Sequence, residues 1–154
     1  MGSAIIELLL FSKEQYNLMG GAVNIALGPV LRIWHEYRIK GEEFHDHAEL
    51  PSVSELEKAF MYSNMNDVII GIERSTVFLP YDQMSLDVGA VAKGFAVQRV
   101  AESMRNKGYS SFLINAGGDI KAVGAKRDYA NSAWNIGVAN PGRRSELFRN
   151  TANC

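Results

Sequence analysis

Apolar side chains recur at three- and four-residue intervals in several stretches of the chain, which is the spacing of one face of an α-helix. The longest of these stretches lies between Asp87 and Gly108, with Val91, Phe95 and Val97 among its apolar positions. Gly108 suits the left-handed conformation in which many helices end. We therefore predict a helix over residues 87–108 and a second over 12–19, which ends before two glycines. A third is predicted over 29–38, with a proline as its first residue.

A fourth helix is predicted to open at Ser52. Glu55 follows three residues later, and this capping-box pattern lets the two residues satisfy free backbone N–H groups at a helix start. Leu56, Ala59 and Phe60 have the spacing of its buried face. This region is therefore expected to pack as an amphipathic helix.

Short apolar runs bounded by turn residues predict strands in the rest of the chain. The expected strands are 68–72 and 76–79, joined as a hairpin, followed by 111–115, 120–123 and 134–138. This order of helices and strands favours a layered α+β domain, with a mostly antiparallel sheet and packed helices, over a doubly wound parallel sheet.

The composition excludes some classes of partner. The chain has 154 residues, enough for one domain, with 47% apolar residues, 21% charged residues and a net charge of -1. This charge balance does not favour binding to nucleic acid, and no apolar stretch is long enough for a transmembrane segment. The apolar N-terminal run lacks the basic start and cleavage pattern of a signal peptide, so the chain as written is expected to be cytoplasmic.

Three glycine-bearing segments are the candidates for chemistry. They are Gly20–Asn24, Leu86–Gly94 and Asn115–Asp119. At a helix start, small residues allow a ligand close to the backbone, free N–H groups favour anions, and Lys93 adds a positive charge for phosphate. Asp87 fits either a helix cap or a contact to a ribose hydroxyl, an amine or a metal. Gly117 and Gly118 fit either a turn between strands or part of a ligand cradle.

Four segments resemble, in order and spacing, the ApbE family of FAD:protein FMN transferases, whose older name is thiamine biosynthesis lipoprotein. LDVGAVAKGFAV, from Leu86, is similar to the family's DLGxxAKGxA segment, and LINAGGDI, from Leu113, is similar to its NxGGDI turn. GAVNIALGPVLRIW, from Gly21, and WNIGVANP, from Trp134, resemble two further family segments. The resemblance covers roughly residues 20–141.

The resemblance implies an ApbE-like, T-fold-related domain that binds FAD with Mg²⁺. The reaction it implies cleaves the FAD pyrophosphate and attaches FMN to a Thr or Ser of an acceptor protein. Such phosphoryl transfer depends on charge neutralisation, which a metal and a lysine supply. Carried over by position, the family pattern assigns Asp87 and Lys93 to FAD and the backbone carbonyl of Ala90 to the metal. The other implied nucleotide contacts are Ala22, Val23, Asn24, Gly117 and Gly118.

The chain departs from the family pattern in length and at two matched positions. Members are much longer, and the motif that carries their Asp and Thr metal ligands has no counterpart here; one carbonyl cannot hold Mg²⁺, which prefers six oxygens. Asn24 stands where many members have Asp, and Ala26 where many have Thr. We expect a domain over 1–142 that is incomplete at both ends, and a disordered or unrelated tail over 143–154. Exposed sheet edges predict a homodimer, unless the chain is a fragment of a longer product.

Two functions remain open at this point. One is Mg²⁺-assisted transfer of FMN from FAD to an acceptor protein, with activity lost if the metal ligands are missing. The other is a non-catalytic flavin-binding or protein-interaction module, whereas a plain structural domain would have no flavin affinity. Family members are often extracytoplasmic and membrane-anchored, which the chain as written does not indicate.

The remaining polar and aromatic residues are interpreted structurally. His45 and His47 lie in a polar stretch, 40–49, and we expect an exposed loop with solvated histidines rather than a metal site. His35 is expected on a helix surface. Core packing, rather than flavin stacking, is expected for Tyr16, Trp34, Phe95 and Trp134.

Overall fold

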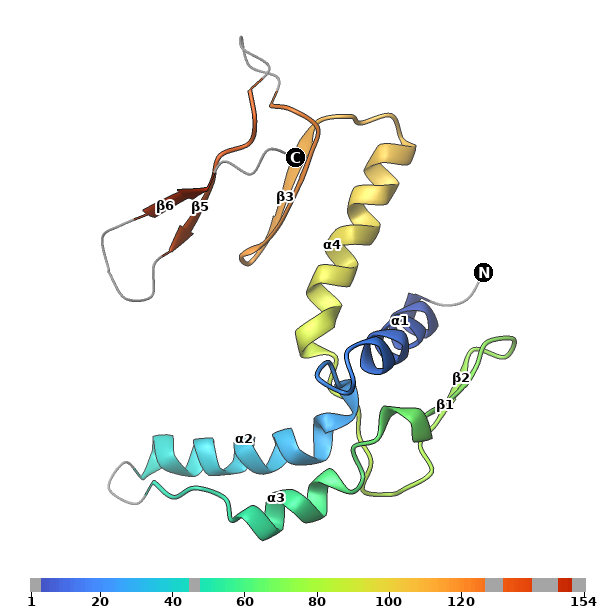
Figure 1. Ribbon diagram of the computed structural model, residues 1–154, viewed down its shortest axis with the longest axis vertical. Helices are drawn as coiled ribbons and strands as arrows, with labels where there is room; N and C mark the ends of the chain where they lie inside the picture. The colour runs from blue at the N-terminus through green and yellow to red at the C-terminus, as the bar shows by residue number, and fades with distance from the viewer. Residues whose placement is uncertain (1–3, 45–47, 127–131, 140–146, 151–154) are drawn as a thin grey trace. The chain divides into compact units, whose positions relative to one another are not determined.

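The computed structural model describes residues 4–44, 48–126, 132–139 and 147–150, and it contains helices together with antiparallel strands, as predicted (Figure 1). These residues fall into two compact units, Met1–Ala92 and Lys93–Cys154. None of the helices in the described part of the chain has the length and apolar character needed to cross a bilayer.

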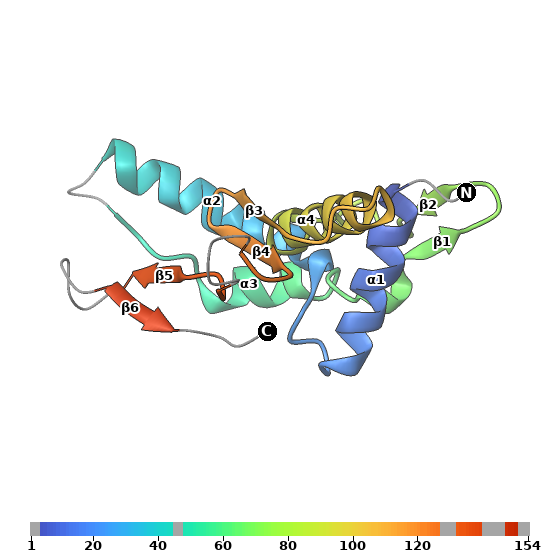
Figure 2. The same cartoon turned by 90° about the horizontal axis from the view of Figure 1, so that it is seen from above.

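The first unit is mainly helical. Its elements are α1 (Ala4–Leu18), the short 3₁₀ helix η1 (Ile25–Leu27), α2 (Gly28–Glu43), α3 (Val53–Phe60), the 3₁₀ helix η3 (Met65–Asp67), β1 (Ile69–Gly71) and β2 (Thr76–Phe78). Helices α2 and α3 lie side by side (Figure 1). Strands β1 and β2 pair as the predicted antiparallel hairpin, which lies beside α1 (Figure 2).

Two helices are longer than the sequence pattern predicted. Helix α1 already begins at Ala4, because the apolar run before Ser12 continues the same helix, and it ends before Gly20 and Gly21, which have φ of 57° and 86°. Helix α2 continues to Glu43, so the expectation of a loop from residue 40 was wrong for its first four residues. The helix tolerates Gly41 in this stretch, and Arg38 and Glu42 form an i,i+4 ion pair along it. The histidines at 45 and 47 lie outside the described residues.

The N-terminus of α3 confirms the Ser52 half of the predicted capping box, but the buried face of the helix differs from the prediction. The Ser52 hydroxyl accepts a hydrogen bond from the Glu55 backbone N–H at 3.2 Å. Leu56 and Ala59 are only half-buried, and Phe60 is 61% exposed. The spacing located this helix correctly, while the absence of a covering layer among the described residues leaves its apolar side open.

The core of the first unit lies where α1, η1 and η3 meet. Its buried side chains are Leu9, Ile25, Ala26, Met65, Val68 and Met84. Complete burial of such an aliphatic side chain contributes about 1.5–3 kcal/mol. Because η1 supplies two of these residues, the segment directly before it is held firmly against the core.

The described part of the second unit contains one long helix and two antiparallel strand pairs. Helix α4 (Gly89–Asn106) starts at the end of the first unit and runs into the second; it is followed by β3 (Phe112–Ala116), β4 (Asp119–Val123), β5 (Ile136–Ala139) and β6 (Leu147–Asn150). The predicted helix and all three predicted strands are present, and Gly108 has a φ of 89° at the helix end.

The strands pair locally rather than in one sheet. Strand β3 pairs only with β4, and β5 only with β6, both antiparallel, so the described strands form three two-stranded sheets with β1–β2. All described strand pairs are antiparallel, as predicted, and each strand pairs with a single neighbour. Strand β6 lies inside the segment expected as a tail, and the boundary at residue 142 stays a prediction.

Candidate functional site

The segment from Ala22 to Asn24 forms the link between α1 and η1. The Asn24 side chain is bonded at both ends: its Oδ1 accepts from the Ala26 N–H at 2.8 Å, and its Nδ2 donates to the Ser63 carbonyl at 2.7 Å. The first bond caps η1 and the second fastens the link to the chain after α3. Ala22 is exposed and Val23 half-buried, so this short stretch is accessible but fixed in place.

Asp87 stands at the start of α4 and acts as a cap there. Its Oδ1 accepts from the Gly89 N–H at 2.8 Å, and Gly89 is the first residue of the helix. The residue is exposed, so the second carboxylate oxygen can accept a hydrogen bond from a ligand. The structural role that the sequence left open for Asp87 is therefore present in the fold, and its role toward FAD stays a prediction.

Two contacts bring the Asn24 segment and the Asp87 segment together. The Asp87 N–H donates to the Ile25 carbonyl at 2.7 Å. A few residues on, Gly28 packs against Ser85 so closely that a Cβ at Gly28 would overlap the hydroxyl and carbonyl oxygens of Ser85. Residues far apart in the sequence, which the family pattern assigns to one ligand, thus lie next to each other in the first unit.

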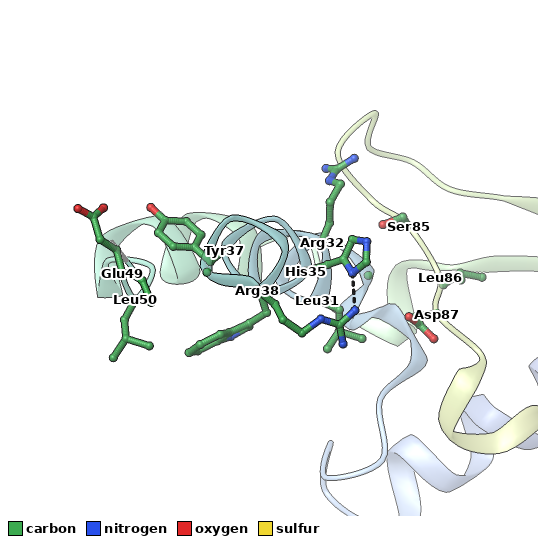
Figure 3. Close-up of a pocket in the computed structure, with 14 residues that line it drawn as sticks. Leu31, Arg32, His35, Tyr37, Arg38, Glu49, Leu50, Ser85, Leu86 and Asp87 are labelled. Carbon is green, nitrogen blue, oxygen red and sulfur yellow. Dashed lines mark hydrogen bonds between the residues drawn. The ribbon is translucent and has the colours of Figure 1, made fainter. Parts of the chain in front are cut away.

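A groove of about 870 Å³ runs along α2 and ends at Ser85–Asp87 (Figure 3). The groove has an apolar wall that includes Leu31 and Trp34, and Trp34 is 43% exposed, so the expectation that it packs in the core was wrong. Most of its residues come from α2, whereas Ser85–Asp87 come from a distant segment. No local sequence pattern predicts such a groove.

Polar groups of α2 add cationic character to this groove. In Figure 3 the side chains of His35 and Arg38 point toward each other, and Arg38 Nη2 lies 2.9 Å from His35 Nδ1. His35 is exposed on the helix surface, as predicted. Arg32, also in the groove, forms no ion pair or hydrogen bond with any residue that the structure describes. Within the described ranges, the groove therefore offers a guanidinium that is not already paired.

Tyr37 connects the groove wall to α3. Its hydroxyl donates to Glu55 Oε2 at 3.2 Å, which joins α2 to α3. The hydrogen bond to the Glu55 carboxylate, together with the negative charge of that carboxylate, raises the pKa of Tyr37 above its ordinary value. The backbone N–H of Glu55 thus bonds to the Ser52 cap of α3, while its carboxylate bonds to Tyr37 of α2.

The other predicted contacts lie in the second unit. Lys93 Nζ is 3.7 Å from Asp119 Oδ2, and Asp119 directly follows Gly117 and Gly118. These glycines form the two-residue turn between β3 and β4, where they have φ of 62° and 100°. The Asn115 side chain accepts from the Gly118 N–H at 3.0 Å. The structural interpretation of the glycines as a hairpin turn is therefore confirmed, and the turn lies beside the lysine.

Magnesium does not fit the described residues on their own. Ala90 is the second residue of α4, so its carbonyl points along the helix toward the N–H four residues later. No group of three or more His, Cys, Asp or Glu residues in the described ranges is arranged to hold a metal ion. A single helical carbonyl is far from the six oxygens that Mg²⁺ prefers.

Each of the two groups of residues, taken by itself, offers polar contacts of a kind that nucleotides use. In the first unit, the second carboxylate oxygen of Asp87 can accept a hydrogen bond from a hydroxyl or an amine. In the second unit, the positive charge of Lys93, beside an open glycine turn, attracts phosphate. The sequence pattern identified these positions but gave no sign of Arg32. Asp119 belonged to the candidate segment Asn115–Asp119, but the sequence assigned it no contact of its own.

The chain matches the model of the ApbE family over residues 1–152. It is 30% identical over 165 aligned residues to the FAD:protein FMN transferase of Treponema pallidum (strain Nichols), covering 98% of this chain and 43% of that protein. It is 29% identical over 137 residues to the FAD:protein FMN transferase of Klebsiella pneumoniae (strain 342), covering 89% of this chain and 39% of that protein.

Solved structures agree with these relatives in fold. The structure named Flavin Transferase ApbE from Vibrio cholerae superposes with a TM-score of 0.74 at 20% identity, over 99% of this chain and 47% of the other. The ApbE protein of Thermotoga maritima gives a TM-score of 0.73 at 21% identity, over 98% and 47%. The chain spans only 39% and 43% of the length of the two curated relatives. Family model, relatives and fold agree, and the chain belongs to the ApbE family.

Proposed function

We propose that this chain binds FAD and takes part in the transfer of FMN from FAD to an acceptor protein. The observation that carries the proposal is the family match over residues 1–152, with curated relatives named FAD:protein FMN transferase at 29% and 30% identity. In this reaction the hydroxyl oxygen of an acceptor Thr or Ser attacks the FMN phosphorus. The pyrophosphate P–O bond breaks, AMP leaves, and the hydroxyl proton is lost.

The first unit supplies one group of proposed FAD contacts. One carboxylate oxygen of Asp87 caps the Gly89 N–H. The other oxygen accepts a hydrogen bond from a hydroxyl or amine of the nucleotide. Ala22, Val23 and Asn24 present their backbone to the nucleotide, because both polar atoms of the Asn24 side chain are used within the fold. The bond between Ile25 and Asp87 supports this assignment, since it holds the two segments side by side.

The second unit supplies the proposed phosphate contacts. Lys93 contributes a positive charge, and the Gly117–Gly118 turn contributes backbone that a ligand can approach. A Cβ placed on either glycine would meet no atom within 4 Å, which supports an open approach to this turn. Phosphoryl transfer relies on such positioning and charge neutralisation more than on covalent help.

Mg²⁺ is the ion proposed for the transfer step, and when bound it would neutralise charge on the pyrophosphate. The family pattern gives it the Ala90 carbonyl, and the described residues supply no cluster of side chains for the rest of its coordination sphere. We therefore expect FAD binding by this chain to be nearly independent of Mg²⁺. The proposed transfer needs metal ligands beyond those described.

Partners of two kinds are proposed. The acceptor is a protein that carries the target Thr or Ser, and a second copy of the chain is a further partner. Exposed apolar side chains on β1–β2 support the second copy, since Ile69 is 59% and Phe78 is 60% exposed. Such large apolar side chains on a two-stranded sheet favour association.

The test combines the chain with FAD, Mg²⁺ and an acceptor protein that contains the target Thr. Mass spectrometry of the acceptor is expected to show an increase equal to one FMN group, together with AMP release. The matched control is the same acceptor with its target Thr replaced by Ala. No flavin affinity by fluorescence quenching, with or without Mg²⁺, would contradict the proposal as a whole.

A second candidate function is a flavin-binding module without catalysis. The absence of a metal-binding cluster in the described ranges favours it. It predicts FAD bound with no mass increase of the acceptor, even when Mg²⁺ is in excess. The same experiment therefore separates the two functions.

A further inference from the structure

The ion pair between Lys93 and Asp119 places opposite charges beside the glycine turn of the second unit. The two side chains remain 61% and 45% exposed, and their charged atoms are 3.7 Å apart. An exposed ion pair of this kind contributes little to stability. Its main effect is electrostatic, because Asp119 cancels most of the positive charge that Lys93 presents to a ligand.

The position of Asp119 is fixed by the hairpin. Asp119 is the first residue of β4 and pairs with Ala116, the last residue of β3, so only Gly117 and Gly118 separate them. The Asn115 side chain fastens this turn through the Gly118 N–H. A ligand phosphate beside the turn therefore meets the lysine and the carboxylate together, at a site of nearly zero net charge.

Such a site distinguishes ligands by their charge. Each phosphorus of a pyrophosphate diester, as in FAD, carries about one negative charge, whereas a terminal phosphate monoester carries about -1.5 to -2 at pH 7. Repulsion from Asp119 weakens the binding of the more highly charged group more strongly. A lysine without this carboxylate would favour nucleoside di- and triphosphates with free terminal phosphates.

We propose that Asp119 is a specificity-determining residue that makes this site select a dinucleotide pyrophosphate over a nucleotide with a terminal phosphate. This inference rests on the proposed FAD binding. The inference also extends that proposal, because it names the residue that disfavours mononucleotides with a terminal phosphate, such as ADP.

The experiment compares Asp119→Asn with the unaltered 154-residue chain. Dissociation constants for FAD and for ADP are measured by fluorescence quenching and by competition, with thermal melting as a check on folding. ADP is expected to bind about two- to fivefold more tightly to Asp119→Asn, the size of an exposed charge interaction, and FAD binding is expected to change less. The gain should shrink as ionic strength rises.

Glu102→Gln is the matched control, because it removes one negative charge from the same unit. Glu102 is exposed on α4 and accepts a hydrogen bond from Gln98 at 2.7 Å, which glutamine can preserve. This control is expected to leave the ratio of ADP to FAD affinity unchanged. The double substitution of Lys93→Gln with Asp119→Asn restores neutrality and should return the ratio toward its original value.

Several outcomes would overturn the inference. An unchanged ratio in Asp119→Asn, with FAD still bound, would show that Asp119 does not set selectivity. An equal loss of affinity for both nucleotides would assign Asp119 only to holding the turn. If Asp119→Asn does not fold, Asp119→Ser is measured in the same way and read by the same criteria. Failure of the proposed function is a separate result, namely no FAD binding by the unaltered chain.

Discussion

At the scale of single residues, Asn24 has a chemical reason to be an amide. Its Nδ2 donates to the Ser63 carbonyl and its Oδ1 accepts from the Ala26 N–H. An aspartate at this position could keep the second bond but has no hydrogen to donate to a carbonyl. The amide of Asn24 is thus matched to the Ser63 carbonyl in this chain.

Asn24→Asp is expected to destabilise the chain by about 1–3 kcal/mol, the cost of placing an acceptor against an acceptor in a part-buried site. Urea unfolding followed by circular dichroism measures this change. Asn24→Ser keeps a capping oxygen but is too short to donate to the Ser63 carbonyl, and because it places no charge there it should cost less. Equal stability of Asn24→Asp and the unaltered chain would contradict the role given to the Ser63 bond.

Asp87 combines two roles that a pair of substitutions separates. Asp87→Asn keeps an oxygen for the Gly89 N–H and removes the charge, so stability is expected to hold while FAD affinity falls about tenfold, since hydrogen bonds to charged groups contribute about 1.5–3 kcal/mol. Asp87→Ala also removes the cap and should cost about 0.5–2 kcal/mol of stability. Calorimetric titration with FAD and thermal melting give the two quantities. Unaltered FAD affinity in Asp87→Asn would exclude the carboxylate as a contact.

At the scale of elements, local signals located the helices and hairpins well. Ser52 with Glu55 identified the start of α3, and Gly108 identified the end of α4. These signals act through backbone hydrogen bonds of a few neighbouring residues, so the sequence alone contains them. Burial was predicted less well, as Phe60 and Trp34 show, because burial depends on which distant element covers a face.

The hairpin turn and the start of α4 give opposite expectations for the same substitution. Gly118→Ala forces a side chain into a φ of 100° and should destabilise the chain by about 1–3 kcal/mol. Gly94→Ala lies within α4, meets no atom within 4 Å, and should stabilise the chain by about 0.5–1 kcal/mol. Paired thermal melts test this. A loss of stability in Gly94→Ala would show that its surface is in contact with another part of the protein.

The contact between α2 and α3 predicts a dependence on alkaline pH. Glu55 raises the pKa of Tyr37, so the folded chain holds the phenolic proton more tightly than the unfolded chain does. The stabilising contribution is complete below the unfolded pKa and is lost as the pH rises through the folded pKa, above about pH 10. The ultraviolet titration difference between the unaltered chain and Tyr37→Phe isolates this group. Glu55→Gln should lower its pKa, whereas Glu57→Gln on the same helix should leave it unchanged.

At the scale of the whole molecule, the two units differ in their buried residues. The first contains the cluster around Ile25 and Met65, whereas the buried apolar residues described in the second are Val97, Ala101 and Phe112. Less buried apolar surface gives less stabilisation. We therefore expect the second unit to open at lower denaturant concentration than the first.

Each unit contains one tryptophan, so unfolding of the two can be followed separately. A chain with Trp134→Phe reports on the first unit through Trp34, and a chain with Trp34→Phe reports on the second through Trp134. The Trp134 fluorescence transition is expected at the lower urea concentration. Coincident transitions would indicate one cooperative unit instead.

The candidate site could be predicted only in part from the sequence. Motifs located Asp87, Lys93 and Gly118 because glycines and charges at helix starts and turns have local signatures. The groove beside α2 and the contact of Asp119 with Lys93 depend on tertiary packing between distant segments. Sequence periodicity contains no information about which distant segments meet, so these parts required the structure.

The close packing of Gly28 on Ser85 has a consequence for protein engineering. Together with the Ile25–Asp87 hydrogen bond, it holds the two ends of the intervening segment, residues 28–85, next to each other. The hairpin turn between β1 and β2 lies within this segment and is exposed. A reporter domain whose own termini lie close together could be inserted after Arg74. It would lengthen the segment without separating its two ends, and the signal of the reporter could then follow ligand binding at a distance.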